Sequence, residues 1–223
     1  MSTLPPVLTI DGPGGAGKGT VSRVVAARLG WHYLDSGAIY RALAVAALRR
    51  GLELDDVEGL VETAHDLPLS FQVEGTECRV LLGAEEIGAE LQSEATGAAA
   101  SRVAPYPAVR AALLDKQRQF RQLPGLVADG RDMGTVVFPD APYKIYLTAS
   151  AEIRARRRLI QLKEKGLDVN LPDLAKELEE RDRRDSERAV APLKPAEDAL
   201  LLDSSDLSIE QVVERILACL RTA

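Results

Sequence analysis

The feature that most constrains the fold is a glycine-rich stretch near the amino terminus, GPGGAGKGT at residues 12–20. Its glycines and Lys18 match the pattern G-x-x-x-x-G-K-(S/T) of the P-loop, in which backbone N–H groups hold the phosphates of a nucleotide. The apolar run VLTI precedes the stretch and the pattern TVSRVVAARL follows it, so a strand before the loop and a helix after it are both predicted. At position 19, glycine replaces the hydroxyl residue that contacts magnesium, and Thr20 comes one place late.

Short apolar runs alternate with helical patterns along the chain. Each run is about as long as a strand and almost continuously hydrophobic, which is typical of a parallel strand buried on both faces. The predicted strands are residues 7–12, 31–37, 126–130, 143–149 and 199–205. The predicted helices are residues 20–30 with Gly30 as C-cap, 39–51, 107–123, and 208–220 with Ser208 as N-cap. The alternation predicts an α/β fold, an open parallel sheet flanked by helices.

One segment departs from this alternation. SFQVEGTECRVLLGAEEI at residues 70–87 alternates like a β-hairpin that turns near residues 74–76, with Gly83 at a second turn. We expect it to form a small antiparallel element inserted between helices. Residues 152–191 are unusually charged, and most of these charges are expected to lie on solvated helix faces.

Composition excludes several classes of protein. The net charge is −6, whereas nucleic-acid-binding proteins are usually basic. No apolar run approaches the roughly 18 residues of a membrane span, and the start, MSTLPPVLTIDG, lacks the basic and apolar regions of a signal peptide. The two histidines are too few for a histidine-based metal site, and the two cysteines lack metal-ligand spacing. We therefore expect a cytoplasmic protein with reduced thiols that binds neither nucleic acid nor membranes.

The predicted helix after the P-loop is followed by LDSGAIYR at residues 34–41. A P-loop protein that phosphorylates a second substrate needs a further anion site facing the loop. Ser36 and Arg41 supply a hydroxyl and a guanidinium group for such a site. The alternative is that Ser36 only caps the helix that follows.

GRDMGTVVFPDA at residues 130–141 begins where a predicted strand ends. Ligands of open α/β sheets bind at the carboxyl ends of the strands, which makes Arg131 a candidate phosphate ligand. Asp132 is a candidate acceptor for an exocyclic amine, because a carboxylate accepts from the N4 amine of cytosine in known pairings. Asp129 ends the strand and is a candidate to hold a metal-bound water. The alternative is an internal Arg–Asp salt bridge at the strand end.

RDRRDSERAVAPL at residues 181–193 spaces Arg181, Asp185 and Arg188 by four and three positions, which predicts one helical face. Arginines stabilise the charge that develops on a transferring γ-phosphoryl group. Asp185 is a candidate acceptor for ribose hydroxyls. Without the P-loop, the same pattern is typical of a solvated helix.

Taken together, these segments resemble bacterial cytidylate kinases along nearly the whole chain. The resemblance rests on GPGGAGKGT, LDSGAIYRALA, the β insertion, ASRVAPYPAVRAALLDKQRQF, LVADGRDMGTVVFPDAPYKIYL and RDRRDSERAVAPL. It implies a single P-loop kinase domain over residues 1–223, and glycine stands at position 19 in the family too. The core would comprise about residues 1–35, 106–150 and 190–223, the monophosphate-binding region with the β insertion about 36–105, and the lid with its flanking helices about 151–189.

The resemblance also implies roles for individual residues. Catalysis would depend on Lys18, Arg131 and Arg188. ATP would bind to Gly12, Pro13, Gly14, Gly15, Ala16, Gly17, Lys18, Gly19 and Thr20, and to the lid arginines Arg154, Arg156, Arg157 and Arg158, of which we select Arg157. The acceptor nucleotide and its phosphate would bind to Ser36, Arg41, Arg131, Arg181, Asp185 and Arg188, and cytosine to Ser101, Arg110 and Asp132.

The implied reaction converts ATP and CMP to ADP and CDP, with dCMP accepted as well. Magnesium would arrive as MgATP. No side chain is assigned as a direct ligand of the magnesium ion. Thr20 is the candidate for such a contact. The implied partners are these nucleotides alone, and the family resemblance implies a monomer.

Three alternatives remain open at this point. A related kinase for UMP, AMP or a small metabolite such as shikimate is disfavoured by the β insertion and the GRDMG motif. A nucleotide-hydrolysing switch would need a water-positioning residue and ordered switch loops, and the sequence has neither signature. A nucleic-acid-binding module built on the arginines at 154–158 is disfavoured by the acidic balance and the lack of interleaved aromatic residues.

Overall fold

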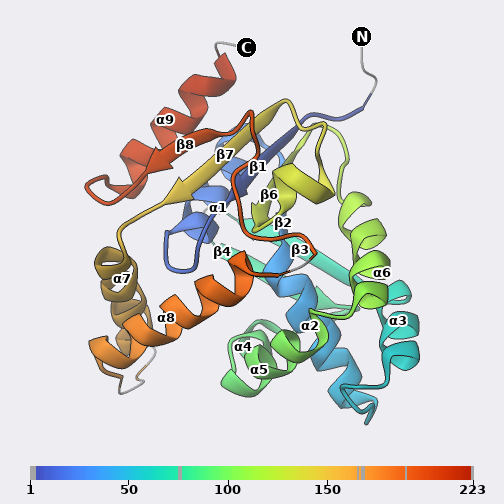
Figure 1. The fold of residues 1–223 in the computed structure, drawn as a ribbon. Helices are drawn as coiled ribbons and strands as arrows, with labels where there is room; N and C mark the ends of the chain where they lie inside the picture. Colours follow the sequence, from blue (N-terminus) through green and yellow to red (C-terminus); the bar gives the residue numbers. More distant parts are fainter. Residues whose placement is uncertain (1–3, 75–76, 165, 167–168, 189, 222–223) are drawn as a thin grey trace.

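The computed structural model describes residues 4–74, 77–164, 166, 169–188 and 190–221. Its centre is a five-stranded parallel sheet with the strand order β2-β6-β1-β7-β8 (Figure 1). The strands are β1 Val7–Asp11, β2 His32–Asp35, β6 Leu126–Gly130, β7 Tyr143–Thr148 and β8 Leu200–Asp203. All five predicted strands and their parallel arrangement are confirmed. Because β1 is the middle strand, the P-loop that follows it emerges at the centre of the carboxyl edge.

Helices cover both faces of this sheet (Figure 1). The core of one face contains α1 Lys18–Leu29 and α9 Ile209–Arg221, and that of the other contains α2 Ser36–Arg49, α3 Val57–His65 and α6 Pro107–Arg118. Side chains of β1 alternate between the two cores: Leu8 and Ile10 point into the first and Val7 into the second. By the same alternation, Thr9 and Asp11 lie on the face of Val7.

Two helix ends agree with the predicted caps and one does not. Gly30 ends α1 in the left-handed region, with φ +63°, and the Ser208 hydroxyl accepts a backbone N–H at 3.2 Å at the start of α9. The helix predicted to extend to residue 123 is shorter, because α6 ends at Arg118. Beyond it the N–H groups of Phe120 and Arg121 bond only three residues back, which turns the chain out of the helix.

The predicted β insertion is confirmed as a three-stranded antiparallel sheet. Its strands are β3 Leu69–Glu74, β4 Glu77–Leu82 and β5 Glu85–Glu86, followed by α4 Gly88–Leu91 and α5 Glu94–Val103. The second turn contains Gly83 with φ +64°, as predicted, while residues 75–76 of the first turn lie outside the described residues. Phe71 joins this sheet to the rest of the molecule, since its ring packs against Tyr33 and Phe120 at centroid distances of 6.0 and 5.4 Å.

The charged stretch forms two packed helices, α7 Ala151–Glu164 and α8 Leu171–Ser186. The prediction that Arg188 shares a helical face with Arg181 and Asp185 is wrong, because α8 ends at Ser186. Arg188 instead turns back on the helix end, where its Nε donates to the backbone carbonyl of Asp185 at 3.2 Å. Within the described part of the chain, no helix has the length and apolar content that a membrane span requires.

Candidate active site

The P-loop connects β1 to α1 in a conformation that its glycines permit. Gly12 has φ +146°, and a Cβ there would lie 2.0 Å from the carbonyl oxygen of Leu147 on β7, so only glycine fits. Gly17 is the N-cap of α1, with φ +91°. The loop therefore passes close to the sheet and leads directly into the amino end of α1, where free N–H groups and the helix dipole favour an anion.

Lys18, the first residue of α1, is buried, and its Nζ donates to the carbonyl oxygen of Pro13 at 2.9 Å. Burial lowers the pKa of its ammonium group, and the charge of Arg131 adds to this effect. Asp129, at the end of β6, is also buried, and burial raises the pKa of its carboxyl group while Lys18 opposes the rise. These two groups support each other's charged forms, and an anion bound beside Lys18 would favour its protonated form further.

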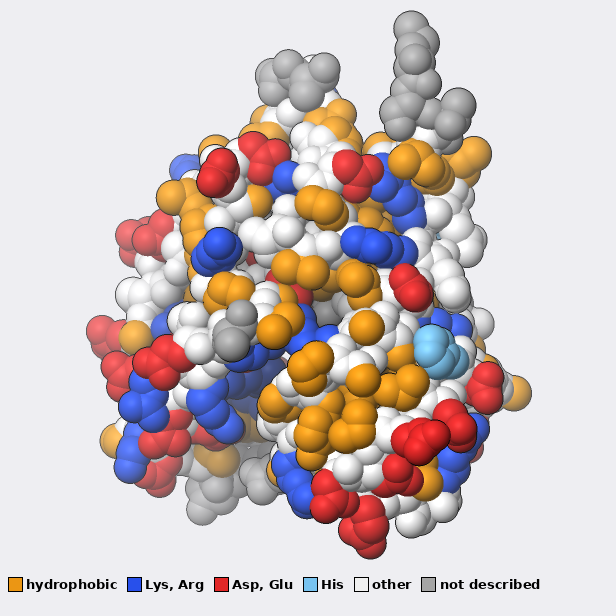
Figure 2. Space-filling view, turned by 45° about the vertical axis from the view of Figure 1, so that its right-hand side comes forward, with side chains coloured by type: hydrophobic (Ala, Val, Ile, Leu, Met, Phe, Trp, Pro, Cys, Tyr) orange, Lys and Arg blue, Asp and Glu red, His pale blue; other side chains and the backbone are white. Residues whose placement is uncertain are grey.

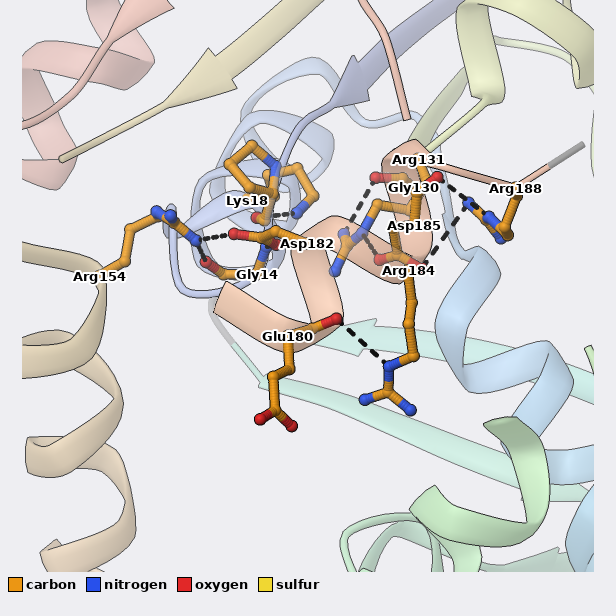
Figure 3. A network of polar contacts seen from close by, with 11 residues as sticks. Gly14, Lys18, Gly130, Arg131, Arg154, Glu180, Asp182, Arg184, Asp185 and Arg188 are labelled. Atoms are coloured by element: carbon orange, nitrogen blue, oxygen red, sulfur yellow. Dashed lines mark hydrogen bonds and ion pairs between the residues drawn. The ribbon is translucent and has the colours of Figure 1, made fainter. Parts of the chain in front are cut away.

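Arg131 lies just after β6, between the P-loop and α8 (Figure 3). Its Nε donates to Asp185 Oδ2 at 3.0 Å, and its Nη2 lies 3.7 Å from where a Cβ on Gly14 would be. Arg188 has a longer ion pair, 3.8 Å, with Asp185 Oδ1. Its Nη2 is buried and has no hydrogen-bond partner among the described residues. A buried guanidinium nitrogen without a partner indicates a place for an anionic ligand.

Arginines from four separate segments lie close enough to repel one another: Arg41 of α2, Arg131 after β6, Arg158 of α7 and Arg181 of α8. Burial lowers the pKa of Arg41, and the charges of Arg158 and Arg131 contribute. The Arg181 side chain reaches solvent, but neighbouring protein atoms partly desolvate its guanidinium group. This desolvation, together with the positive charge of Arg131, lowers the pKa of Arg181 to about 10. Figure 2 shows Lys and Arg side chains gathered in a hollow of the surface. Such a concentration of like charge is typical of a site for polyanions.

A second polar arrangement lies between α6 and the turn after β6. Arg110 Nη2 and Asp132 Oδ2 form a 2.6 Å ion pair whose side chains are 11% and 8% exposed. The guanidinium also lies 5.7 Å from the centre of the Tyr40 ring. Arg131 and Asp132 each have an ion pair, but with partners on α8 and α6 rather than with each other. Ser101, on α5, is exposed and forms no hydrogen bond with this pair within the described residues.

The interpretation of Ser36 as a helix cap is wrong. Asp35 is the N-cap of α2, and its Oδ1 accepts the N–H three residues on at 3.0 Å. Ser36 is buried as the first residue of the helix, so its hydroxyl is not used as the cap. Arg41 is half-buried on the same helix and donates from Nη1 to the carbonyl oxygen of Leu91 at 3.2 Å.

The arginines of α7, which are predicted to belong to a lid, have different surroundings. Arg154 is buried and donates to the carbonyl oxygen of Gly14 at 3.0 Å. Arg157 donates to the carbonyl oxygen of Ala16 at 3.2 Å. Arg156 is exposed and pairs with an acid one turn back on its own helix. Arg154 and Arg157 therefore lie against the P-loop, whereas Arg156 does not.

Three polar residues near the loop had no predicted role. Asp182 of α8 accepts the N–H of Gly14 at 3.2 Å (Figure 3). Asp11, at the end of β1, accepts two N–H groups of the turn after β6. Ser204, just after β8, accepts from Arg157 at 2.9 Å. A signal existed for Asp11 and Ser204, which are polar residues at the carboxyl ends of apolar strands, where ligands of parallel sheets bind. The packing of α8 on the loop has no comparable sequence signal.

The described residues contain no group of three or more histidine, cysteine or acidic side chains placed to hold a metal ion. Asp129 Oδ2 lies 3.4 Å from where a Cβ on Gly19 would be, so this carboxylate is next to the end of the loop. Magnesium binds oxygen ligands, commonly one or two carboxylates together with phosphates and water. Asp129 therefore fits a magnesium ion that arrives with a nucleotide. The 3.4 Å distance is an ordinary contact, so packing alone does not require glycine at position 19.

Comparison with known proteins identifies a family. The family model described as cytidylate kinase matches residues 8–222. A cytidylate kinase of Methylococcus capsulatus is 61% identical over 222 residues, covering 100% of both chains, and one of Photobacterium profundum is 57% identical over 223 residues, covering 100% of this chain and 98% of that one. An uncharacterized protein from Eubacterium ventriosum, 9% identical, has a similar fold, with a TM-score of 0.53 over 98% of this chain and 99% of that chain.

Proposed function

The chain belongs to the cytidylate kinase family, and from that premise we propose that it transfers the γ-phosphoryl group of ATP to CMP and dCMP, giving ADP and CDP or dCDP. The observation that carries the assignment of the site is the group of mutually repelling arginines beside the P-loop lysine. A P-loop alone is sufficient to bind the phosphates of one nucleotide. A second set of cations facing it is what an enzyme needs to bring two phosphorylated substrates together.

ATP binds at the P-loop, residues 12–20, with its outer phosphates at Lys18. Among the lid arginines we assign this role to Arg157, because it contacts the loop through Ala16 and the turn after β8 through Ser204. Arg154 supports the loop from beneath through the Gly14 carbonyl and holds the lid to it. Arg156 contributes least, because it is exposed and paired on its own helix.

CMP binds on the other side of the cleft. Its phosphate is bound by Arg41, Arg131 and Arg188, with Ser36 at the amino end of α2 and Arg181 on α8, and Asp185 on α8 accepts from ribose hydroxyls. Its cytosine is read by the Arg110–Asp132 pair, and Ser101 on α5 is assigned to the same base by the family resemblance. Asp132 accepts from the N4 amine of cytosine, while uracil presents lone pairs there and leaves the carboxylate without a partner.

The chemistry follows from the charge of the acceptor. The attacking group is a phosphate oxygen that is already anionic near neutral pH, so no side chain has to remove a proton. Lys18, Arg131 and Arg188 hold the two phosphate chains in line and neutralise the charge that develops between them. Magnesium, when bound with ATP near Asp129 and Thr20, neutralises further phosphate charge.

The proposed division of the chain follows these roles. The core comprises about residues 1–35, 106–150 and 190–223, residues 36–105 bind the monophosphate, and residues 151–189 form the lid. Closure of the lid excludes water, which would otherwise accept the phosphoryl group. We expect the enzyme to act as a monomer in the cytoplasm.

The test incubates the purified protein with ATP, Mg²⁺ and each of CMP, dCMP, UMP, AMP and GMP, while ADP and the nucleoside diphosphate are quantified together. The expected result is CDP and dCDP formed in step with ADP, and slower turnover of UMP. Equal ADP formation without an acceptor would identify a hydrolase and would contradict the assignment of a second nucleotide site. Efficient transfer to AMP or UMP would retain the kinase and overturn the cytosine assignment.

A further inference from the structure

Asp11 is the last residue of the central strand β1 and directly precedes the P-loop. Its side chain lies on the face of the sheet opposite to the one that α1 covers. It shares the face of Val7 and Thr9, where the π-helical turn η1 Met133–Val137 packs. Its side chain is 4% exposed. The two oxygens are used separately: Oδ1 accepts the N–H of Met133 at 2.9 Å and Oδ2 accepts the N–H of Gly134 at 2.8 Å.

A buried carboxylate of this kind is costly to the fold. No salt bridge to Asp11 exists among the described residues, so only the two N–H groups and more distant charges stabilise its ionised form. Burial raises the pKa of Asp11 to about 6, against the lowering effect of those two N–H groups. An apolar residue at this position would leave the buried N–H groups of Met133 and Gly134 without acceptors, so Asp11 is the residue that holds this turn to β1.

The role follows from what the two N–H groups belong to. They are the first two of η1, and the residue directly before them is Asp132, the N-cap of that turn, with φ −140°. Asp132 carries the carboxylate proposed to read cytosine and is paired with Arg110 at 2.6 Å. A carboxylate that holds residues 133 and 134 at two points fixes the direction in which the side chain of residue 132 leaves the backbone.

We infer that Asp11 is a positioning residue for base recognition: it holds the η1 turn against the P-loop strand so that Asp132 faces the cytosine ring. The inference rests on the proposed role of Asp132. It connects the two substrates through one side chain, since the strand that ends in Asp11 begins the ATP loop. Asp11 does not touch either substrate and acts only through the turn.

The test uses the Asp11→Asn variant of the full chain. The amide keeps one acceptor oxygen but turns an NH₂ toward the second backbone N–H, so one hydrogen bond is lost and the turn is released at one point. We expect the ratio of kcat/KM for CMP to that for UMP to fall about tenfold, with KM for CMP raised and KM for ATP within about twofold of the wild-type value. A merely structural defect would instead affect CMP, UMP and ATP alike.

Thr9→Val is the matched control. Thr9 lies two residues earlier on the same face of β1, and its hydroxyl is buried beside Gly134 without a hydrogen-bond partner among the described residues. It contacts the same turn but does not hold it, so the CMP to UMP ratio should stay within about twofold of the wild-type ratio. An equal fall in Thr9→Val and Asp11→Asn would overturn the inference, because the fall would then not depend on the hydrogen bonds that Asp11 accepts.

A double-mutant cycle separates this inference from the proposed function. Asp132→Ala alone should reduce the discrimination between CMP and UMP, and adding Asp11→Asn to it should reduce it no further, because both act through the same carboxylate. If Asp132→Ala leaves the ratio unchanged, the proposed cytosine reading fails. If Asp132→Ala lowers the ratio and Asp11→Asn does not, the reading stands and the role of Asp11 fails.

A second variant serves if Asp11→Asn does not fold. A Cβ on Gly134 would lie 2.9 Å from Thr9 Oγ1, so Gly134→Ala moves the same turn away from β1 without changing a charge. It should lower the CMP to UMP ratio in the same direction while KM for ATP stays within about twofold. A folded Gly134→Ala variant with unchanged discrimination would contradict the inference.

Discussion

At the scale of single residues, the P-loop depends on the absence of a side chain at Gly12. We expect Gly12→Ala to lower the free energy of unfolding by about 3 kcal/mol or more and to abolish ATP binding, because a Cβ would meet the Leu147 carbonyl oxygen at 2.0 Å in a backbone conformation with φ +146°. Denaturant unfolding and calorimetric titration with ATP measure both effects.

Gly97→Ala supplies the control for that substitution. Gly97 lies within α5, and a Cβ there has nothing within 4 Å, so alanine should raise the free energy of unfolding by about 0.5–1 kcal/mol. The two substitutions make the same chemical change with opposite expected signs. If both destabilised the protein equally, the close approach of the loop to β7 would not be the cause.

Asp11 also predicts a pH dependence. Its pKa is raised from 3.8 to about 6 in the folded protein, so between these values the folded state holds a proton that the unfolded state has released. The unfolded state is therefore favoured progressively as the pH rises from about 4 to about 6, and the stability of the wild type relative to Asp11→Asn should fall by about 3 kcal/mol across that window.

The measurement is urea unfolding of both proteins at several pH values from about 3 to about 8. Only the difference between them is informative, because every other titrating group contributes to both curves. Below about pH 4 and above about pH 6 the difference should be constant. A difference that rises with pH across the window would mean that the Asp11 carboxylate is stabilised by folding, contrary to its burial.

At the scale of secondary-structure elements, α8 contacts the P-loop through Leu178, which lies beside Gly14, and through a hydrogen bond to Asp182. Asp182 accepts the Gly14 N–H at 3.2 Å and forms an ion pair with Arg154 of α7. We expect Asp182→Ala to release α8, leaving Arg154 with only backbone carbonyls, at a local free-energy loss of about 1–3 kcal/mol. Hydrogen exchange of the α8 amides should accelerate by about tenfold or more.

Glu180→Ala is the control on the same helix. Glu180 is exposed, and Figure 3 shows its carboxylate pointing away from the P-loop. Its replacement should leave the exchange of α8 within about twofold of the wild-type rate. Equal acceleration in both variants would show that α8 is loosened by any loss of charge and that its contact with Gly14 does not hold it.

At the scale of the whole molecule, the small β sheet is attached through Phe71, whose ring packs against Tyr33 of β2 and Phe120 beyond α6. We expect Phe71→Ala to lower the free energy of unfolding by about 2–3 kcal/mol, which corresponds to roughly 5–10 °C in Tm for a chain of this size. Leu123→Ala, at a side chain that is 74% exposed, should change Tm by less than about 2 °C. Similar decreases of Tm in the two variants would show that the Phe71 contacts stabilise the protein no more than an exposed side chain does.

The strands were predictable because a parallel strand buried on both faces is a continuous apolar run, and all five runs became strands. Their order was not, since nothing local states that β6 lies between β1 and β2. Arg188 and Asp182 show the same limit within the site, since local sequence patterns did not predict where tertiary packing places them. A helical spacing assigns residues to a face only while the helix lasts, and it does not say which face packs on a loop 168 residues away in sequence.

The carboxylates of α8 give the proposed nucleotide site a mixed charge. Asp182 already occupies the Gly14 N–H, and Asp185 already neutralises Arg131, so two positions proposed for phosphate hold protein anions. Phosphates that bind at these two positions would therefore replace the carboxylates of Asp182 and Asp185 as partners of the Gly14 N–H and of Arg131. Because these carboxylates already offset part of the positive charge of the arginines, binding of a nucleotide neutralises less net charge than the number of arginines suggests. The affinity for nucleotides should therefore depend only weakly on salt concentration. Because both carboxylates belong to α8, this exchange would couple the binding of phosphates to the position of that helix in the proposed lid.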